Sequence, residues 1–267
     1  GTPVWGKYQQ NGVVWALTPL VGGGLAFGIA SVLPRPGAPE RCCVAVLAGF
    51  VGAVLANVRF SFLGAGSAPG TVRGAVQRAL ALDGVAWGVA VTAGAALVVG
   101  AVVWWDVRRD EAGGLRRVLL ALGSLVAFSA GGSQVGLAVG PLLPLLDEVG
   151  MVSATAVLIG GGLGMLAGSW TGAPRMIKSL AQDYSSLGPR RSISALVPSF
   201  LIAQLAVLLG VPVSFNDIVV SAIIGSGAAV GGRSAVDARK IGVTVGAWAG
   251  SFGLSFVLAY ATAFLLL

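Results

Sequence analysis

The chain has 267 residues, of which 56% are hydrophobic and only 10% are charged, and its mean hydropathy is +0.89. A soluble chain carries about a quarter charged residues, because its surface must be hydrated. The composition therefore excludes ordinary soluble enzymes, disordered chains and disulfide-stapled domains, and it indicates a multi-pass membrane protein.

Scarce residue types narrow the chemistry further. The chain has no His, and its two cysteines, Cys42 and Cys43, are neighbours. A Cys/His metal centre and a His-dependent catalytic triad are therefore excluded, and we expect no metal, no catalytic residue and no enzyme. We attribute the net charge of +7 to cytoplasmic loops, and we expect no nucleic-acid partner.

Six apolar runs are long enough to cross ~30 Å of hydrocarbon, which takes about 20 helical residues. The runs cover residues 12–33, 42–63, 84–105, 118–146, 150–170 and 241–267. We predict a helix for each, and so an all-α, polytopic membrane protein. The charged segment 106–117 between two of them is expected to be a cytoplasmic loop.

Two apolar stretches are interrupted. Within 118–146, the polar and glycine residues Ser129–Gln134 and the pair Gly140-Pro141 predict a discontinuous helix, with close packing of small residues as the alternative. Within 193–226, Leu209–Pro212 leaves two halves too short to span, which predicts a re-entrant hairpin. Breaks of this kind usually line a substrate pathway.

Basic residues set the predicted orientation. If 193–226 returns to its own side, most Arg and Lys residues fall on one side, among them Arg108, Arg109 and Arg116. The positive-inside rule makes that side cytoplasmic and turns Asp147-Glu148 outward. We therefore expect a multi-pass protein of the cell membrane with cytoplasmic basic loops.

The two ends of the sequence resemble each other. Lys7 and Trp15 are spaced like Lys240 and Trp248, at a constant offset of 233 residues, and both pairs lead into Gly-rich apolar helices. The predicted orientation places Lys7 outside and Lys240 inside. The two copies are therefore expected to be inverted, an organisation common among secondary transporters.

This repeat divides the chain. We expect residues 1–105 to hold the remainder of a first repeat with connecting helices, and 118–267 to hold the second repeat. The matching half of the first repeat is expected upstream of Gly1 in the same protein or on a separate chain. A homo-oligomer is the expected assembly.

Two motifs resemble those of the inorganic phosphate transporter (PiT) family. Residues 127–142, AFSAGGSQVGLAVGPL, are similar to the family signature AFSHGANDVANAIGPL. Residues 210–214, GVPVS, followed by 222–227, AIIGSG, are similar to the family's GLPVSTTH hairpin and the GAIxG that follows it. The resemblance covers roughly residue 115 to the end, together with 1–34. It implies an inverted-repeat permease that couples phosphate to a cation.

The chain departs from these motifs at polar positions. Ser133-Gln134 replaces the family's Asn-Asp, and Leu137 replaces its second Asn. Asn216-Asp217 replaces the Thr-His that ends the hairpin motif, so a carboxylate returns there. Gln134 supplies no charge. The coupling ion therefore remains open between Na⁺ and H⁺.

The expected site combines half-helix N-termini with polar side chains, because backbone N–H groups and a positive dipole end suit an oxyanion. The expected substrate-binding residues are Gly131, Gly132, Ser133, Gln134, Ser214 and Asn216. The expected cation-coupling residues are Ser129, Gln134 and Asp217. For the serines, a helix N-cap or an interhelical hydrogen bond is the alternative.

Three other polar residues have weaker functional signals. Arg59, near the end of the run 42–63, could attract anions, although such residues more often snorkel to the membrane surface. Asn57 and Gln204 are expected to bond neighbouring helices.

The sequence thus predicts secondary active transport of inorganic phosphate by alternating access, as symport with Na⁺ or H⁺. A sulfate or other oxyanion permease and a non-transporting, permease-like membrane subunit are the alternatives. The expected partners are the anion, the cation and the lipid bilayer, with no cofactor beyond Na⁺ as a coupling ion.

Overall fold

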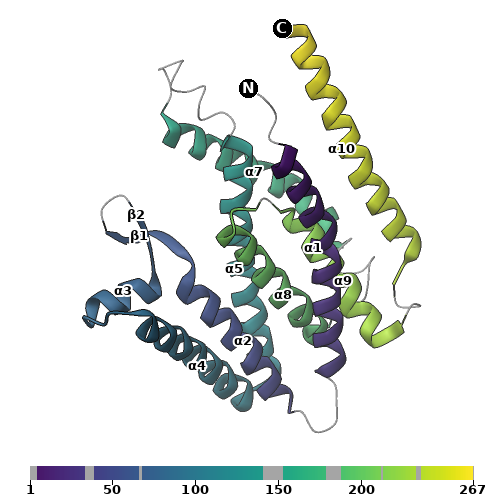
Figure 1. Ribbon diagram of the computed structural model, residues 1–267. Helices are drawn as coiled ribbons and strands as arrows, with labels where there is room; N and C mark the ends of the chain where they lie inside the picture. The colour runs from purple at the N-terminus through teal and green to yellow at the C-terminus, as the bar shows by residue number, and fades with distance from the viewer. Residues whose placement is uncertain are drawn as a thin grey trace.

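The computed structural model describes residues 5–33, 39–65, 68–140, 153–178, 188–211, 213–232 and 236–266. These residues form a bundle of helices with one small two-stranded sheet (Figure 1). The elements are α1 (Trp5–Val32), α2 (Glu40–Asn57), β1 (Arg59–Ala65), β2 (Ala68–Thr71), α3 (Val72–Ala79), α4 (Val85–Arg109), α5 (Glu111–Val139), α7 (Ala154–Lys178), α8 (Pro189–Leu208), α9 (Phe215–Gly231) and α10 (Ala238–Leu266).

Among the described helices, seven are long and apolar enough to cross a membrane, and α9, with 17 residues, is shorter. The seven are α1, α2, α4, α5, α7, α8 and α10. The prediction of a helical, multi-pass membrane protein is confirmed. The expectation that both halves of 193–226 are too short to span is wrong for the first half, because α8 has 20 residues and is long enough to cross. The small antiparallel sheet of β1 and β2 is the addition that the sequence analysis did not foresee.

The predicted helix over 42–63 is wrong at its end. α2 stops at Asn57, and Arg59 begins β1, because residues 59–62 alternate polar and apolar side chains with the period of a strand. Arg59 therefore lies beyond the helix rather than within it. The expected loop over 106–117 also contracts, since α4 ends at Arg109 and α5 begins at Glu111.

The predicted discontinuity at Ser129–Gln134 is wrong. α5 is helical without a break from Glu111 to Val139. Glycine costs a helix about 1 kcal/mol, whereas each backbone group left without a hydrogen bond in hydrocarbon costs several, so the helix continues. The alternative of close helix packing is not borne out at Gly131 and Gly132 either, since a β-carbon on each would meet nothing within 4 Å. The expected bend at Gly140-Pro141 and the outward pair Asp147-Glu148 fall at or beyond the limit of the described residues.

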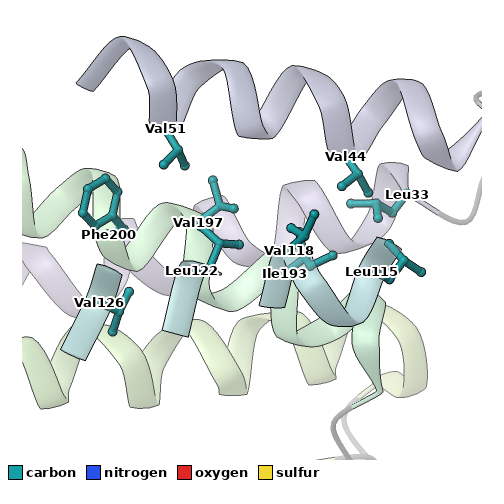
Figure 2. Close-up of a cluster of buried hydrophobic side chains, with 10 residues drawn as sticks. All are labelled: Leu33, Val44, Val51, Leu115, Val118, Leu122, Val126, Ile193, Val197 and Phe200. Atoms are coloured by element: carbon teal, nitrogen blue, oxygen red, sulfur yellow. The ribbon is translucent and has the colours of Figure 1, made fainter. Parts of the chain in front are cut away.

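The main core lies where α2, α5 and α8 meet the end of α1 (Figure 2). α5 and α8 supply side chains at three- and four-residue intervals, the spacing that keeps them on one face of a helix. The buried residues of this core are Leu33, Val44, Val51, Leu115, Val118, Leu122, Val126, Ile193, Val197 and Phe200. α8 is consequently the most enclosed of the candidate spans.

Small residues bring two helix pairs into close contact. In the pair α1 and α9, a β-carbon on Gly23 would lie 3.1 Å from the Ser221 carbonyl oxygen. In the pair α2 and α4, a β-carbon on Gly52 would lie 2.8 Å from Val99 Cβ. Close backbone approach through small residues is the usual way that helices associate in membranes.

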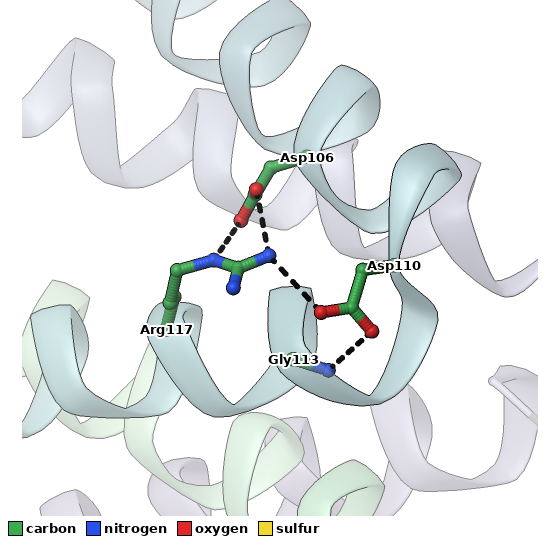
Figure 3. Close-up of polar contacts among 4 residues, drawn as sticks. All are labelled: Asp106, Asp110, Gly113 and Arg117. Carbon is green, nitrogen blue, oxygen red and sulfur yellow. Dashed lines mark hydrogen bonds and ion pairs between the residues drawn. The ribbon is translucent and has the colours of Figure 1, made fainter.

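The junction between α4 and α5 is the single residue Asp110 (Figure 3). Its carboxylate caps α5 by accepting a hydrogen bond from the Gly113 N–H at 3.0 Å. Arg117 binds Asp106 in a bidentate pair, with both N···O distances at 2.8 Å, and reaches Asp110 at 3.6 Å. These contacts hold the end of α4 against the start of α5 across a minimal turn.

Candidate functional site

The hairpin between α8 and α9 is built around Gly210. Gly210 has φ of +66°, its N–H donates to the Val207 carbonyl, and the Val211 N–H donates to the Ala206 carbonyl. This pair of hydrogen bonds is a Schellman motif, which ends a helix where glycine can take the left-handed conformation. The predicted break at 209–212 is therefore present, with Pro212 itself outside the described residues.

The N-terminus of α9 follows at once. The Ser214 side chain accepts a hydrogen bond from the Asp217 N–H at 3.4 Å and serves as the N-cap. Asp217 lies in the first turn of α9, where the positive end of the helix dipole stabilises a carboxylate. The start of α9 therefore offers backbone N–H donors to an anion and also carries the carboxylate of Asp217.

A cavity of about 430 Å³ lies beside this helix end. It is bounded by α1, α5, the α8–α9 connection with the start of α9, and α10. The lining residues are Trp15, Thr18, Pro19, Gln134, Val213, Ser214, Asp217, Trp248 and Phe252. The cavity therefore joins Gln134 of the first motif to Ser214 and Asp217 of the second.

The described residues of this cavity lining carry negative charge and no positive charge. Asp217 is its one ionisable side chain among the described residues, and Thr18, Gln134 and Ser214 are neutral polar groups. Thr18 is 7% exposed, and its hydroxyl donates to the Val14 carbonyl. The site can offer hydroxyl and amide contacts to a ligand, but its fixed charge is negative.

Other predicted site residues lie elsewhere. Ser129 and Gly132 line a second hollow on another side of α5, where the Gln204 side-chain amide donates to the Ser129 hydroxyl. Gly131 lies within the unbroken helix, so no half-helix N-terminus follows it. Asn216 is exposed and is not part of the cavity lining, and the Ser133 side chain is outside the described residues.

Sequence reasoning overlooked several residues of the cavity. Thr18, Val213 and Phe252 carried no signal of their own. Trp15 and Trp248 did carry one, because they anchor the repeat at an offset of 233 residues, yet they were not proposed as site residues. Both tryptophans line the same cavity.

No group of three or more Cys, Asp or Glu side chains that could hold a metal ion occurs in the described parts of the chain.

Comparison with known proteins finds phosphate transporters, both by a family model and by individual relatives. The sequence model of the phosphate transporter family matches residues 2–259. A probable low-affinity inorganic phosphate transporter of Mycobacterium tuberculosis is 28% identical over 210 residues, which cover 68% of this chain and 50% of the relative. Human sodium-dependent phosphate transporter 1 is 28% identical over 166 residues, covering 59% of this chain and 24% of the relative.

The fold has a solved counterpart. A structure described as the sodium-dependent phosphate transporter aligns with a TM-score of 0.60 and 20% sequence identity, covering 85% of this chain and 58% of that one. This likeness concerns the fold alone. The chain spans half or less of the length of the curated relatives it matches.

Proposed function

The chain belongs to the phosphate transporter family, and on this premise we propose that the cavity at the start of α9 binds inorganic phosphate for cation-coupled transport. One observation carries the proposal. The cavity unites Gln134 with Ser214 and Asp217, so both family-like motifs meet at one point. Neutral donors from two motifs suit an oxyanion that must be held and then released.

The carboxylate explains why a cation is needed. A phosphate anion beside ionised Asp217 is repelled, and this repulsion is large where water is scarce. Na⁺ bound at Asp217, or a proton on it, removes the repulsion. Binding of cation and anion is thereby coupled. Phosphate keeps a proton to share near neutral pH, which favours phosphate slightly over sulfate.

The two ends of the chain support an inverted repeat that works by alternating access. Trp15 lies in α1 and Trp248 in α10, so the offset of 233 residues relates two long apolar helices. The two helices run in opposite directions in Figure 1. Helices related in this way line the central pathway of many secondary transporters.

A re-entrant α8–α9 hairpin is part of the same proposal. The start of α9 shares the cavity with Thr18 of α1 and Phe252 of α10, both near the middle of their helices. A hairpin whose tip reaches the middle of its neighbours enters the bilayer and returns on the same side. The basic side is then cytoplasmic, and the membrane is the cell membrane.

The proposed assembly rests on how much of its relatives this chain covers. The matched region covers 50% of the mycobacterial relative and 24% of the human one, so we propose that a further repeat half, from the same protein or another chain, completes the transport unit within a homo-oligomer.

The test is labelled phosphate uptake into proteoliposomes that contain this chain together with the repeat half that completes it, under sodium and proton gradients in turn, with excess sulfate as competitor. Asp217→Asn is compared with Asp83→Asn, which removes an exposed carboxylate outside the cavity. We expect uptake that resists sulfate and falls only in Asp217→Asn. Uptake suppressed by sulfate would favour the sulfate alternative, and no uptake under either gradient would favour the subunit alternative.

A further inference from the structure

A second hollow, separate from the transport cavity, lies where the end of α2 and the start of β1 approach α5 and α8. Its volume is about 370 Å³. Its walls are mainly aliphatic and aromatic, and its lining residues are Leu55, Val58, Arg59, Phe60, Leu125, Phe128, Ser129, Gly132, Phe200, Gln204 and Val207. We refer to these residues as the lateral groove.

The lateral groove opens sideways from the bundle. Phe128 is 72% exposed and Val207 is 56% exposed, whereas Phe200 and Gln204 at its floor are 1% and 6% exposed. In a membrane-spanning bundle, exposed apolar side chains of this kind face lipid tails. An apolar hollow that opens toward lipid is suited to an alkyl chain.

Arg59 gives the lateral groove a charged end. It lies two residues after α2, a candidate span of 18 residues and about 27 Å, and so at the level where lipid phosphates are found. No carboxylate pairs with Arg59 among the described residues. The next two basic residues along the chain do have hydrogen-bond acceptors. Arg73 donates to the Asn57 side chain, and Arg78 donates to the Leu63 carbonyl.

We propose that the lateral groove binds an anionic phospholipid, with one acyl chain along Phe128, Phe200 and Val207 and the phosphate at Arg59. The hydrogen bond from Gln204 to Ser129 satisfies the donor at the floor, so the chain meets no polar group that lacks a partner there. Charge complementarity at one end and apolar walls along the rest select an anionic lipid over a free ion.

The test uses the full chain in detergent, exchanged with mixed phosphatidylglycerol and phosphatidylcholine, washed, and examined for retained lipid by native mass spectrometry. Arg59→Gln removes the charge, and Val207→Trp fills the hollow while leaving the charge. Arg108→Gln, at the opposite end of the α2–α4 pair, is the matched control. Circular dichroism establishes equal helical content before comparison.

We expect the wild type and Arg108→Gln to retain phosphatidylglycerol about fivefold over phosphatidylcholine, the preference that one basic residue provides. Arg59→Gln should abolish this preference, and Val207→Trp should lower retention of both lipids. An unchanged preference in Arg59→Gln, or unchanged retention in Val207→Trp, would overturn the proposal. Displacement of the lipid by millimolar inorganic phosphate would instead identify a free-anion site.

Discussion

Gly23 of α1 and Gly225 of α9 touch backbone to backbone, because a β-carbon built on Gly225 would clash with the Gly23 carbonyl. Ser221, one turn earlier on α9, approaches Gly23 through its carbonyl oxygen and Gly22 through its hydroxyl, each 3.1 Å from a β-carbon built on that glycine. The α1–α9 pair contributes Thr18 and Asp217 to the cavity at the start of α9. The glycine contact therefore sets how far apart the two sides of the site lie.

Gly225→Ala is expected to separate α1 from α9 and to destabilise the protein by about 3 kcal/mol or more, because neither backbone can yield without losing helical hydrogen bonds. Gly24→Ala is the control, since a β-carbon there meets nothing within 4 Å. It should be neutral or stabilising by up to about 1 kcal/mol. Thermal unfolding in detergent measures both. Equal melting temperatures would show that the close contact does not hold the pair together.

Moving the carboxylate across the cavity tests the coupling role of Asp217. Asp217→Asn should reduce gradient-driven uptake by at least about tenfold, because the cation loses its charged partner. Combining it with Gln134→Asp returns a carboxylate to the position where the family motif carries one, and should restore part of the uptake. Retained uptake in Asp217→Asn would reduce this residue to a helix-dipole partner.

Ser129→Ala should destabilise the protein by about 1–3 kcal/mol, because it leaves the Gln204 amide buried without its acceptor. Adding Gln204→Leu removes the orphaned amide, so the double variant should recover most of the loss. A thermal double-mutant cycle measures this coupling.

Uptake provides a second measurement on the same variants. Ser129 lies outside the cavity at the start of α9, so Ser129→Ala should leave the dependence of uptake on Na⁺ or H⁺ unchanged. A change in coupling ion would return Ser129 to the cation site.

The α4–α5 turn depends on the Asp110 cap more than on its ion pairs. Asp110→Ala should cost about 1 kcal/mol of stability, whereas Asp110→Asn keeps a capping oxygen and should cost little. Asp106→Asn disrupts an exposed pair with Arg117 and should lower the melting temperature less than Asp110→Ala does. This difference should be greatest at high salt, where exposed ion pairs are screened. A larger loss for Asp106→Asn would reverse this ranking.

Much of the fold was predictable, because bilayer thickness fixes the length of an apolar run and glycine marks a helix end. The runs containing Trp15, Trp105 and Trp248 all became helices, and the break at Gly210 was recognised from its composition. The capping role of Ser214 was an alternative that its spacing to Asp217 allowed.

The site was harder to predict, because it depends on which face of a continuous helix each residue occupies. Ser129 and Gln134 are five residues apart on α5, so they point about 140° apart around its axis. A break at Ser129–Gln134 would free the two side chains from this fixed angle. Because a break was predicted there, both residues were assigned to one site. The end of α2 was misjudged for another reason, since hydropathy does not distinguish the last turn of a helix from an apolar strand.

The contact between Gly23 and Gly225 also bears on biosynthesis. The two residues are roughly 200 positions apart, so α9 leaves the ribosome about 10–40 s after α1 at ordinary rates of elongation. During that interval, the small-residue face of α1 lies in the membrane without the helix that will cover it. Slowed translation before Gly225 should therefore expose α1 to quality-control proteases for longer.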